Sequence, residues 1–236
     1  MRNGHIGFNR YFKLVRISAT ARILKGVKPT QSLMETDTYI LSFTSAGLAF
    51  SESIVIAETY LMLGDWKATK EKVKSENLIQ ARTRSSIQRV YQEIEPRLKE
   101  LSADQLELLV EGTIQEQKQL LWLAVCKRYA YIREFAVEVI HEKYMRMDYE
   151  VTDFDYDAFF NRKADWHEEL DRLADSTRRK VKTVIFRMLR EAEIIDKDHI
   201  ILPTILTRRM IEVLAPDAPI SYRIFPVSIP EREAFD

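Results

Sequence analysis

The chain has 236 residues, of which 46% are apolar and 31% are charged, and its formal net charge is zero. A single cysteine, Cys126, excludes a disulfide framework and a zinc site built from several cysteines. No stretch reaches the roughly 18 uncharged apolar residues that a membrane span needs, so we expect a protein of the reducing cytoplasm with no membrane as partner.

Charge is sorted into blocks along the chain. Residues 1–34 hold seven Lys or Arg and no acid, whereas the block 66–99 carries a local charge of +5. The block 148–171 carries −7, and the block 172–190 carries +6. Such sorting allows one strongly positive face on a neutral protein. Residues 1–38 are predicted to be a basic arm or a misannotated extension.

The next part, 39–147, is predicted to be a helical N-terminal domain. A first helix starts after Thr44 or Ser45, which are cap residues, and ends at Gly64. Asp65 caps a short helix that reaches about Ser75. A third helix starts near Thr83, with apolar residues on one stripe. These are Ile87, Val90, Ile94 and Leu98.

The second half of this domain has its own start and stop signals. Ser102 with Gln105 resembles a capping box, and Gly112 ends the helix that follows. The stretch from Thr113 to Met147 is the most apolar of the chain and is long for one globular helix. It is predicted to form two helices, broken near 129–132, at the centre of the core.

Residues 148–214 are predicted to form a winged helix-turn-helix-like domain. Helices at about 155–162 and 166–173 precede a longer helix from Thr177 to about Ala192, capped by Asp175 or Ser176. Two β-branched runs, EIID and HIIL, flank a polar turn and predict a β-hairpin.

After this hairpin, Thr204 is predicted to cap a last helix to about Leu214. The proline-containing tail, 215–236, is predicted to be extended. The fold class is therefore all-α: a helical bundle with a helix-turn-helix-like N-terminal part and a C-terminal winged helix that carries a short β-hairpin.

The order of three helices and a hairpin indicates nucleic-acid contact, since the third helix of a winged helix-turn-helix enters the major groove. In this chain the contacts are expected at the N-terminal end of the third helix, where free backbone N–H groups also favour a phosphate. The predicted DNA-binding residues there are Thr177, Arg178, Arg179, Lys180 and Lys182. A second predicted patch comprises Arg82, Arg84, Ser86 and Arg89. Lys197, at the wing tip, could reach a minor groove.

Each of these features also has a simpler interpretation. A basic helix surface is often only a solvated face, and Thr and Ser near position 83 could simply cap a helix. Winged helices also serve as protein-interaction modules. No metal, cofactor or catalytic residue is expected, because the four histidines are scattered and the HExxH, GxxxxGK[ST] and GxGxxG motifs are missing. We therefore do not expect an enzyme.

Three segments in order resemble the BrxA family of the BREX phage-defence systems of bacteria. They are YILSFTSAGLAFSESIVIAETYLMLGDW, ENLIQARTRSSIQRVYQEIEPRLKELS and LADSTRRKVKTVIFRMLREAEII, and the resemblance covers about Tyr39 to Leu214. It implies a small, mainly helical cytoplasmic protein that binds double-stranded DNA, has a helical body likened to the antitermination factor NusB, and has no catalytic activity. Other BREX proteins would be possible partners. The chain has EAEII where the family would place a Gly, so Glu193 has to end the long helix.

Three rival functions stay open at this level. A protein–protein adaptor would keep its affinity at physiological salt, whereas a DNA-binding protein would lose it steeply. An RNA-binding, NusB-like protein would prefer structured RNA over duplex DNA of equal length. A metal-dependent nuclease is least favoured, because no carboxylate cluster stands at suitable spacing.

Overall fold

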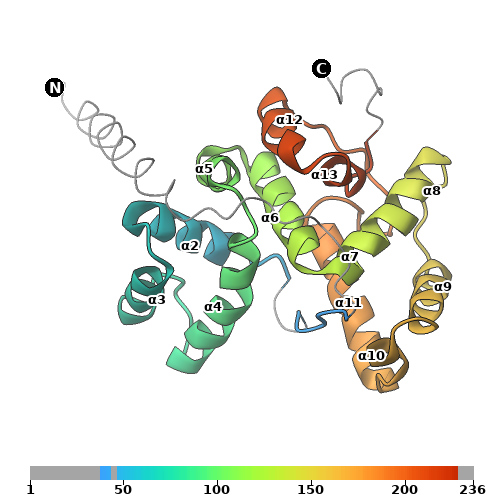
Figure 1. Cartoon of the computed structure of the whole chain (residues 1–236), viewed down its shortest axis with the longest axis horizontal. Coiled ribbons are helices and arrows are strands. Elements are labelled where there is room, and N and C mark those ends of the chain that lie inside the picture. Colours follow the sequence, from blue (N-terminus) through green and yellow to red (C-terminus); the bar gives the residue numbers. More distant parts are fainter. Residues whose placement is uncertain (1–37, 44–46, 228–236) are drawn as a thin grey trace.

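The computed structural model describes residues 38–43 and 47–227, and these residues form a mainly helical protein in which no regular strand occurs (Figure 1). The predicted all-α class is confirmed. The predicted basic arm, the caps proposed at Thr44 and Ser45, and the end of the tail lie outside the described residues.

The first four helices that the structure describes follow their local signals, except that the first starts at Phe50, later than predicted from Thr44 or Ser45, and its N-cap residue Ala49 makes no side-chain hydrogen bond. They are α2 (Phe50–Leu63), α3 (Trp66–Ser75), α4 (Arg84–Leu98) and α5 (Ala103–Glu111). Gly64 ends α2 in the left-handed conformation, with a φ of 66°. The Asp65 carboxylate accepts the Ala68 N–H at 2.7 Å and so caps α3, as predicted. The capping box of Ser102 and Gln105 is also confirmed.

Helix α6 (Ile114–Arg128) is the central element. Nine of its residues are buried, from Glu116 to Cys126, because neighbouring helices surround it. It contacts α2, α4, α5 and α11. The predicted break falls at Tyr129, after which the chain continues as α7 (Ala130–Phe135), the π-helical segment η1 (Ala136–His141) and α8 (Glu142–Met145).

The C-terminal module contains α9 (Asp153–Ala164), the short α10 (Glu168–Asp171) and α11 (Asp175–Glu191). The three predicted helices are confirmed. The predicted cap of the third is wrong: α11 begins at Asp175 itself, and its N-cap residue is Ala174, which makes no side-chain hydrogen bond. The backbone of Ala174 instead accepts the N–H groups of Thr177 and Arg178, at 2.8 and 3.0 Å.

The predicted β-hairpin is not formed as regular strands. Among the described residues there are only isolated antiparallel bridges, Ile195 with Ile201 and Glu150 with Ile200. The segments are too short for a ladder because the turn at Asp196–His199 uses much of the polar backbone for local hydrogen bonds. Glu193 ends α11 with a φ of 58°, the left-handed conformation for which a Gly is better suited.

The end of the described chain corrects two predictions. The last predicted helix starts later than Thr204: α12 (Arg208–Leu214) is capped by Thr207. The described part of the tail, up to Val227, does not have an extended conformation, because it forms η2 (Ala215–Asp217) and α13 (Ile220–Arg223). Trp122 of α6 donates its indole N–H to the carbonyl of Ile224 at 2.9 Å, so this segment folds back onto the core.

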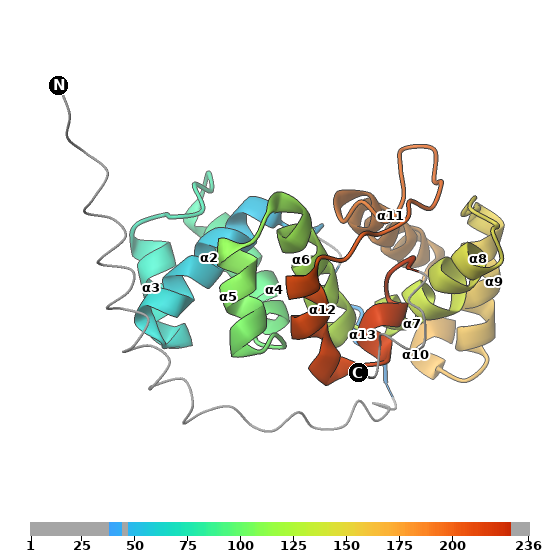
Figure 2. The same ribbon diagram turned by 90° about the horizontal axis from the view of Figure 1, so that it is seen from above.

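Two groups of helices flank α6 in both views (Figures 1 and 2). Helices α2 to α5 lie on one side, and α7 to α11 lie on the other. Helices α4 and α11 approach each other at their C-terminal ends and spread apart toward their N-terminal ends (Figure 1). Helices α12 and α13 lie at the edge of the molecule that is opposite the N-terminal ends of α4 and α11 (Figure 1). In the described part of the chain no helix has the length and apolar character needed to cross a bilayer.

Candidate nucleic-acid interface

The first cationic cluster lies at the start of α4, and we call Arg82, Arg84, Ser86 and Arg89 the α4 patch. The three arginines are exposed. Within residues 38–43 and 47–227, none of them forms an ion pair with a carboxylate. Their charges are therefore available to an anion from solvent, and Arg can hold a phosphate or a base edge with two parallel hydrogen bonds.

Ser86 has a structural role within this patch. Its N–H donates to the Thr83 hydroxyl at 3.1 Å, and the two hydroxyls lie 2.8 Å apart. Ser85 also contacts the Thr83 hydroxyl, at 3.0 Å. The hydroxyl cluster caps α4, which orients Arg84 and Arg89 on the first turns of the helix.

The second cluster lies at the start of α11, and we call Thr177, Arg178, Arg179, Lys180 and Lys182 the α11 patch. Part of it is neutralised. Arg178 pairs with Asp157 of α9 at 3.0 Å, and its guanidinium lies 4.1 Å from the ring centroid of Phe160. Lys182 pairs with Asp153 at 2.7 Å and lies 3.9 Å from Asp157. These two cations face α9 rather than open solvent.

The remaining cations of the α11 patch are open. Arg179 and Lys180 are exposed, and neither forms an ion pair among the residues that the structure describes. Thr177 is half-buried in the first turn of α11. Asp175 stands in the same turn and works against an anion there. Two cations, rather than four, therefore remain for a phosphate backbone.

Lys197 lies apart from both patches. Its side chain is 88% exposed in the turn between the bridged segments, and its only ion-pair neighbour in the described chain is Asp198, at 3.7 Å. The turn sets Lys197 and the carboxylates of Asp196 and Asp198 side by side, so its net positive field is small.

Helix α3 adds cations that were not among the predicted contacts. Lys67, Lys70 and Lys74 recur at a spacing of three and four, which places them on one side of the helix. Helix α3 packs against α4. Lys67 is exposed, and none of the three pairs with a carboxylate in the described part of the chain. Their periodicity could have identified them from the sequence.

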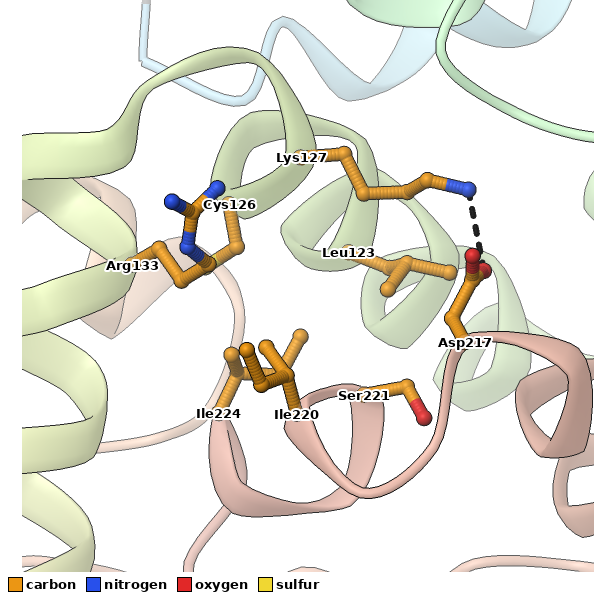
Figure 3. A pocket seen from close by; sticks show the side chains of 8 residues that line it. All are labelled: Leu123, Cys126, Lys127, Arg133, Asp217, Ile220, Ser221 and Ile224. Atoms are coloured by element: carbon orange, nitrogen blue, oxygen red, sulfur yellow. Dashed lines mark hydrogen bonds and ion pairs between the residues drawn. The ribbon is translucent and has the colours of Figure 1, made fainter. Parts of the chain in front are cut away.

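The cavity in Figure 3 lies between α6 and the C-terminal segment. Its volume of about 10 Å³ holds roughly one water molecule. Leu123, Ile220 and Ile224 line it together with Cys126, and Lys127 pairs with Asp217 at its rim at 2.9 Å. Burial raises the pKa of the Cys126 thiol well above its ordinary value, which disfavours the reactive thiolate. This cavity does not suit a substrate.

The described residues bring together no group of three or more His, Cys, Asp or Glu side chains that could hold a metal ion. Two of the described histidines have other partners. His141 contacts the carbonyl of Phe225 at 2.9 Å, and His167 contacts Glu169 at 3.2 Å. The candidate site of the described residues therefore consists of charged surfaces.

Comparison with known proteins gives relatives in two bacteria. Over 145 residues the chain is 27% identical to "BREX protein BrxA" of Escherichia coli O9:H4 (strain HS), which covers 61% of this chain and 68% of that protein. Over 123 residues it is 32% identical to "BREX protein BrxA" of Bacillus cereus (strain H3081.97), which covers 52% of this chain and 62% of that protein.

A solved structure supports the fold. The crystal structure of an uncharacterized protein from Magnetospirillum magneticum superposes with a TM-score of 0.67, covering 80% of this chain and 98% of the other. The two sequences are 20% identical, so this likeness concerns the fold alone. The profile of the BrxA family matches residues 37–217, and this chain therefore belongs to the BrxA family.

Proposed function

We propose that this chain is a non-catalytic accessory protein of a BREX phage-defence system that binds double-stranded DNA in the cytoplasm. One observation carries the proposal: Arg82, Arg84 and Arg89 project from the start of α4 into solvent without a carboxylate partner in the described chain. Unpaired cations at a helix start suit phosphate, which dominates the affinity of proteins for DNA. The family, whose members above carry BREX in their names, supports the context.

The winged-helix interpretation of the C-terminal module is part of this proposal. Three short segments are joined by backbone hydrogen bonds beside α11: Val151 N–H to His199 at 3.0 Å, and Leu202 N–H to Ile194 at 2.9 Å. In this proposal the bridged segments would take the place of the wing beside the third helix of a winged helix. Arg179 and Lys180 would then be its phosphate contacts.

The test is fluorescence anisotropy with a labelled duplex of about 30 base pairs across a salt series. If about six phosphates are neutralised, the logarithm of affinity falls with the logarithm of salt at a slope of about −5. Arg84→Glu/Arg89→Glu weakens binding at least ten-fold, and Arg179→Glu/Lys180→Glu weakens it several-fold. Full affinity of the α4-patch variant, with its helical content unchanged, would overturn the proposal.

The matched control is Arg208→Glu/Arg209→Glu, which makes the same change of charge on α12, at the opposite edge of the molecule (Figure 1). It is expected to weaken binding less than three-fold. Competition with structured RNA of equal length separates the RNA-binding alternative, since stronger competition by RNA would favour the NusB-like function. Incubation with plasmid and magnesium tests for a nuclease, and the plasmid is expected to stay intact.

A second candidate, a protein–protein adaptor, is favoured by exposed apolar side chains on α9 and in the segments that connect it to α8 and α10. Met147, Phe154 and Trp166 are 79%, 78% and 85% exposed. Where such residues form one contiguous patch, they mark an interaction surface. An adaptor would show no steep salt dependence toward DNA and no effect of the α4-patch substitutions on duplex affinity.

A further inference from the structure

A single peptide group joins the two basic helices. The carbonyl of Gly47 accepts a hydrogen bond from Arg97 Nη1 at 2.7 Å, and the N–H of Leu48 donates to Glu191 Oε2 at 2.5 Å. Arg97 lies in the last turn of α4, and Glu191 is the last residue of α11. The C-terminal ends of both helices are therefore tied to the Gly47–Leu48 peptide group, which we call the clamp.

The charges of the clamp match the peptide dipole. A guanidinium faces the carbonyl oxygen, and a carboxylate faces the N–H, so both hydrogen bonds are charge-assisted. Arg97 is only 3% exposed and is held in turn by Glu93, at 2.7 Å, and by the ring of Tyr129, whose centroid lies 5.4 Å from the guanidinium. Burial excludes water, which strengthens these contacts and restricts Arg97 to one position.

Gly47 permits the close approach. A Cβ atom at this position would lie 2.1 Å from Oε2 and 2.6 Å from the carboxyl carbon of Glu191. Any larger residue would push the Glu191 carboxylate away from the Leu48 N–H. The atoms displaced belong to the end of a flexible side chain, so a Cβ at position 47 is expected to break the contact with Leu48 rather than to prevent folding.

The cationic patches stand at the far ends of the two clamped helices. Arg84 precedes Arg97, and Arg178 precedes Glu191, by roughly 13 residues each, which is about 20 Å along an α-helix. The two N-terminal ends can therefore stand up to about 40 Å apart, and one turn of B-DNA spans about 34 Å. Figure 1 shows α4 and α11 converging at their C-terminal ends, which carry Arg97 and Glu191, and diverging toward their N-terminal ends.

We propose that the clamp sets the angle between α4 and α11 so that both patches contact one duplex, with Gly47 and Glu191 as positioning residues. This inference rests on the proposed function. Two patches held at a fixed separation bind one duplex with a high effective concentration of the second contact. If the angle between the two helices is no longer fixed, the duplex still binds one patch, but the effective concentration of the second patch falls.

The decisive variants change Glu191. Glu191→Ala removes an anion, so electrostatics alone would tighten DNA binding and leave the salt slope unchanged. If the clamp sets the helix angle, its loss should instead weaken DNA binding. On a duplex of about 30 base pairs we expect roughly ten-fold weaker binding and a slope shallower by about 2. A duplex of about six base pairs, which is only roughly 20 Å long, reaches only one patch and should bind with less than a two-fold change.

Glu191→Gln is the conservative variant, because its amide oxygen can still accept the Leu48 N–H, and it should keep the wild-type slope. Gly47→Ala should resemble Glu191→Ala. Gly64→Ala is the matched control: it adds a methyl group at the end of α2 in open space, under left-handed backbone strain, and should lower stability without changing the slope.

A second measurement needs no DNA. Spin labels at Ser85→Cys and Lys180→Cys, on full-length protein in which the native Cys126 is buried, report the separation of the two patches. Glu191→Ala should broaden the distance distribution, and Glu191→Gln should not. If folded Glu191→Ala keeps both the wild-type distance distribution and the wild-type salt slope of DNA binding, the inference about the clamp is overturned, whereas the proposed function is not. A wild type that binds no duplex overturns the proposed function, whatever the labels show.

Discussion

At the scale of single residues, cations that look equivalent in the sequence have different surroundings. Arg178 and Lys182 stand four residues apart, so they share one side of α11 and face α9. Asp153 and Asp157 have the same spacing on α9, and the two pairs meet. Arg179 and Lys180 point elsewhere and stay open to solvent. The acidic block of the chain thus neutralises part of the basic block that follows it.

This pairing predicts that α9 weakens the DNA affinity of the α11 patch. Asp153→Asn/Asp157→Asn should raise duplex affinity three- to ten-fold at about 50 mM salt, because two cations are released and two anions near the phosphates are removed. The side chains of Asp153 and Asp157 are 79% and 47% exposed, so the loss of stability should stay within about 1 kcal/mol. Fluorescence anisotropy and urea unfolding measure the two effects.

The control for this prediction carries the same charge change. Asp165→Asn/Asp171→Asn alters exposed carboxylates beside α10 that form no ion pair among the described residues. It should raise affinity less than two-fold. Equal gains by the two double variants would mean that net charge, rather than the α9–α11 ion pairs, controls the affinity.

At the scale of helices, start signals were predicted well where one side chain caps its own helix. Asp65, Thr83 and Ser102 each accept an N–H group from within three residues, so the sequence contains both partners. The start of α12 was misplaced at Thr204 because two threonines compete. Thr207 is selected by a distant partner, since its hydroxyl donates to Glu116 at 2.6 Å.

Glu116 predicts a measurable dependence of stability on pH. The hydrogen bond from the Thr207 hydroxyl, helped by the Thr113 N–H and opposed by burial, lowers the pKa of Glu116 below its ordinary value of 4.5. A depressed pKa in the folded state gives stability that is present above pH 4.5 and is lost as pH falls through the folded value. Wild type should therefore be more stable than Glu116→Gln at pH 7, by about 1–3 kcal/mol.

The same difference should shrink as the pH is lowered through the folded pKa of Glu116. Urea unfolding of both proteins at a series of pH values measures it. Glu58→Gln, on the exposed side of α2, is the control and should show no such difference. A constant gap between wild type and Glu116→Gln at every pH would contradict the assignment.

At the scale of the whole molecule, the C-terminal segment completes the core. The prolines of this segment indicated an extended tail, yet Ile224 and Phe225 are almost completely buried. Asp217 accepts hydrogen bonds from Gln105 and Lys127, both at 2.9 Å, which ties the segment to α5 and α6. The predicted division into domains, with boundaries after residues 38, 147 and 214, stays a prediction.

Removal of all residues after Leu214 should therefore destabilise the protein by several kcal/mol, because it exposes Trp122 and removes its acceptor, the Ile224 carbonyl. Tryptophan fluorescence should shift to longer wavelength, since Trp122 is fully buried in the intact chain. Truncation after Val227 keeps these contacts and serves as the control. An unshifted spectrum after removal of 215–236 would contradict this role.

The sequence by itself determined the helical class, most helix starts and stops, the sorting of charge and the family. Each of these depends on interactions within a few residues, or on patterns that need no coordinates. The tertiary structure decided which cations stay open, where the tail lies, and how Arg97, the Gly47–Leu48 peptide group and Glu191 join two helices. Those outcomes depend on groups far apart in the chain, such as Leu48 and Glu191, which are 143 positions apart and which only tertiary packing brings together.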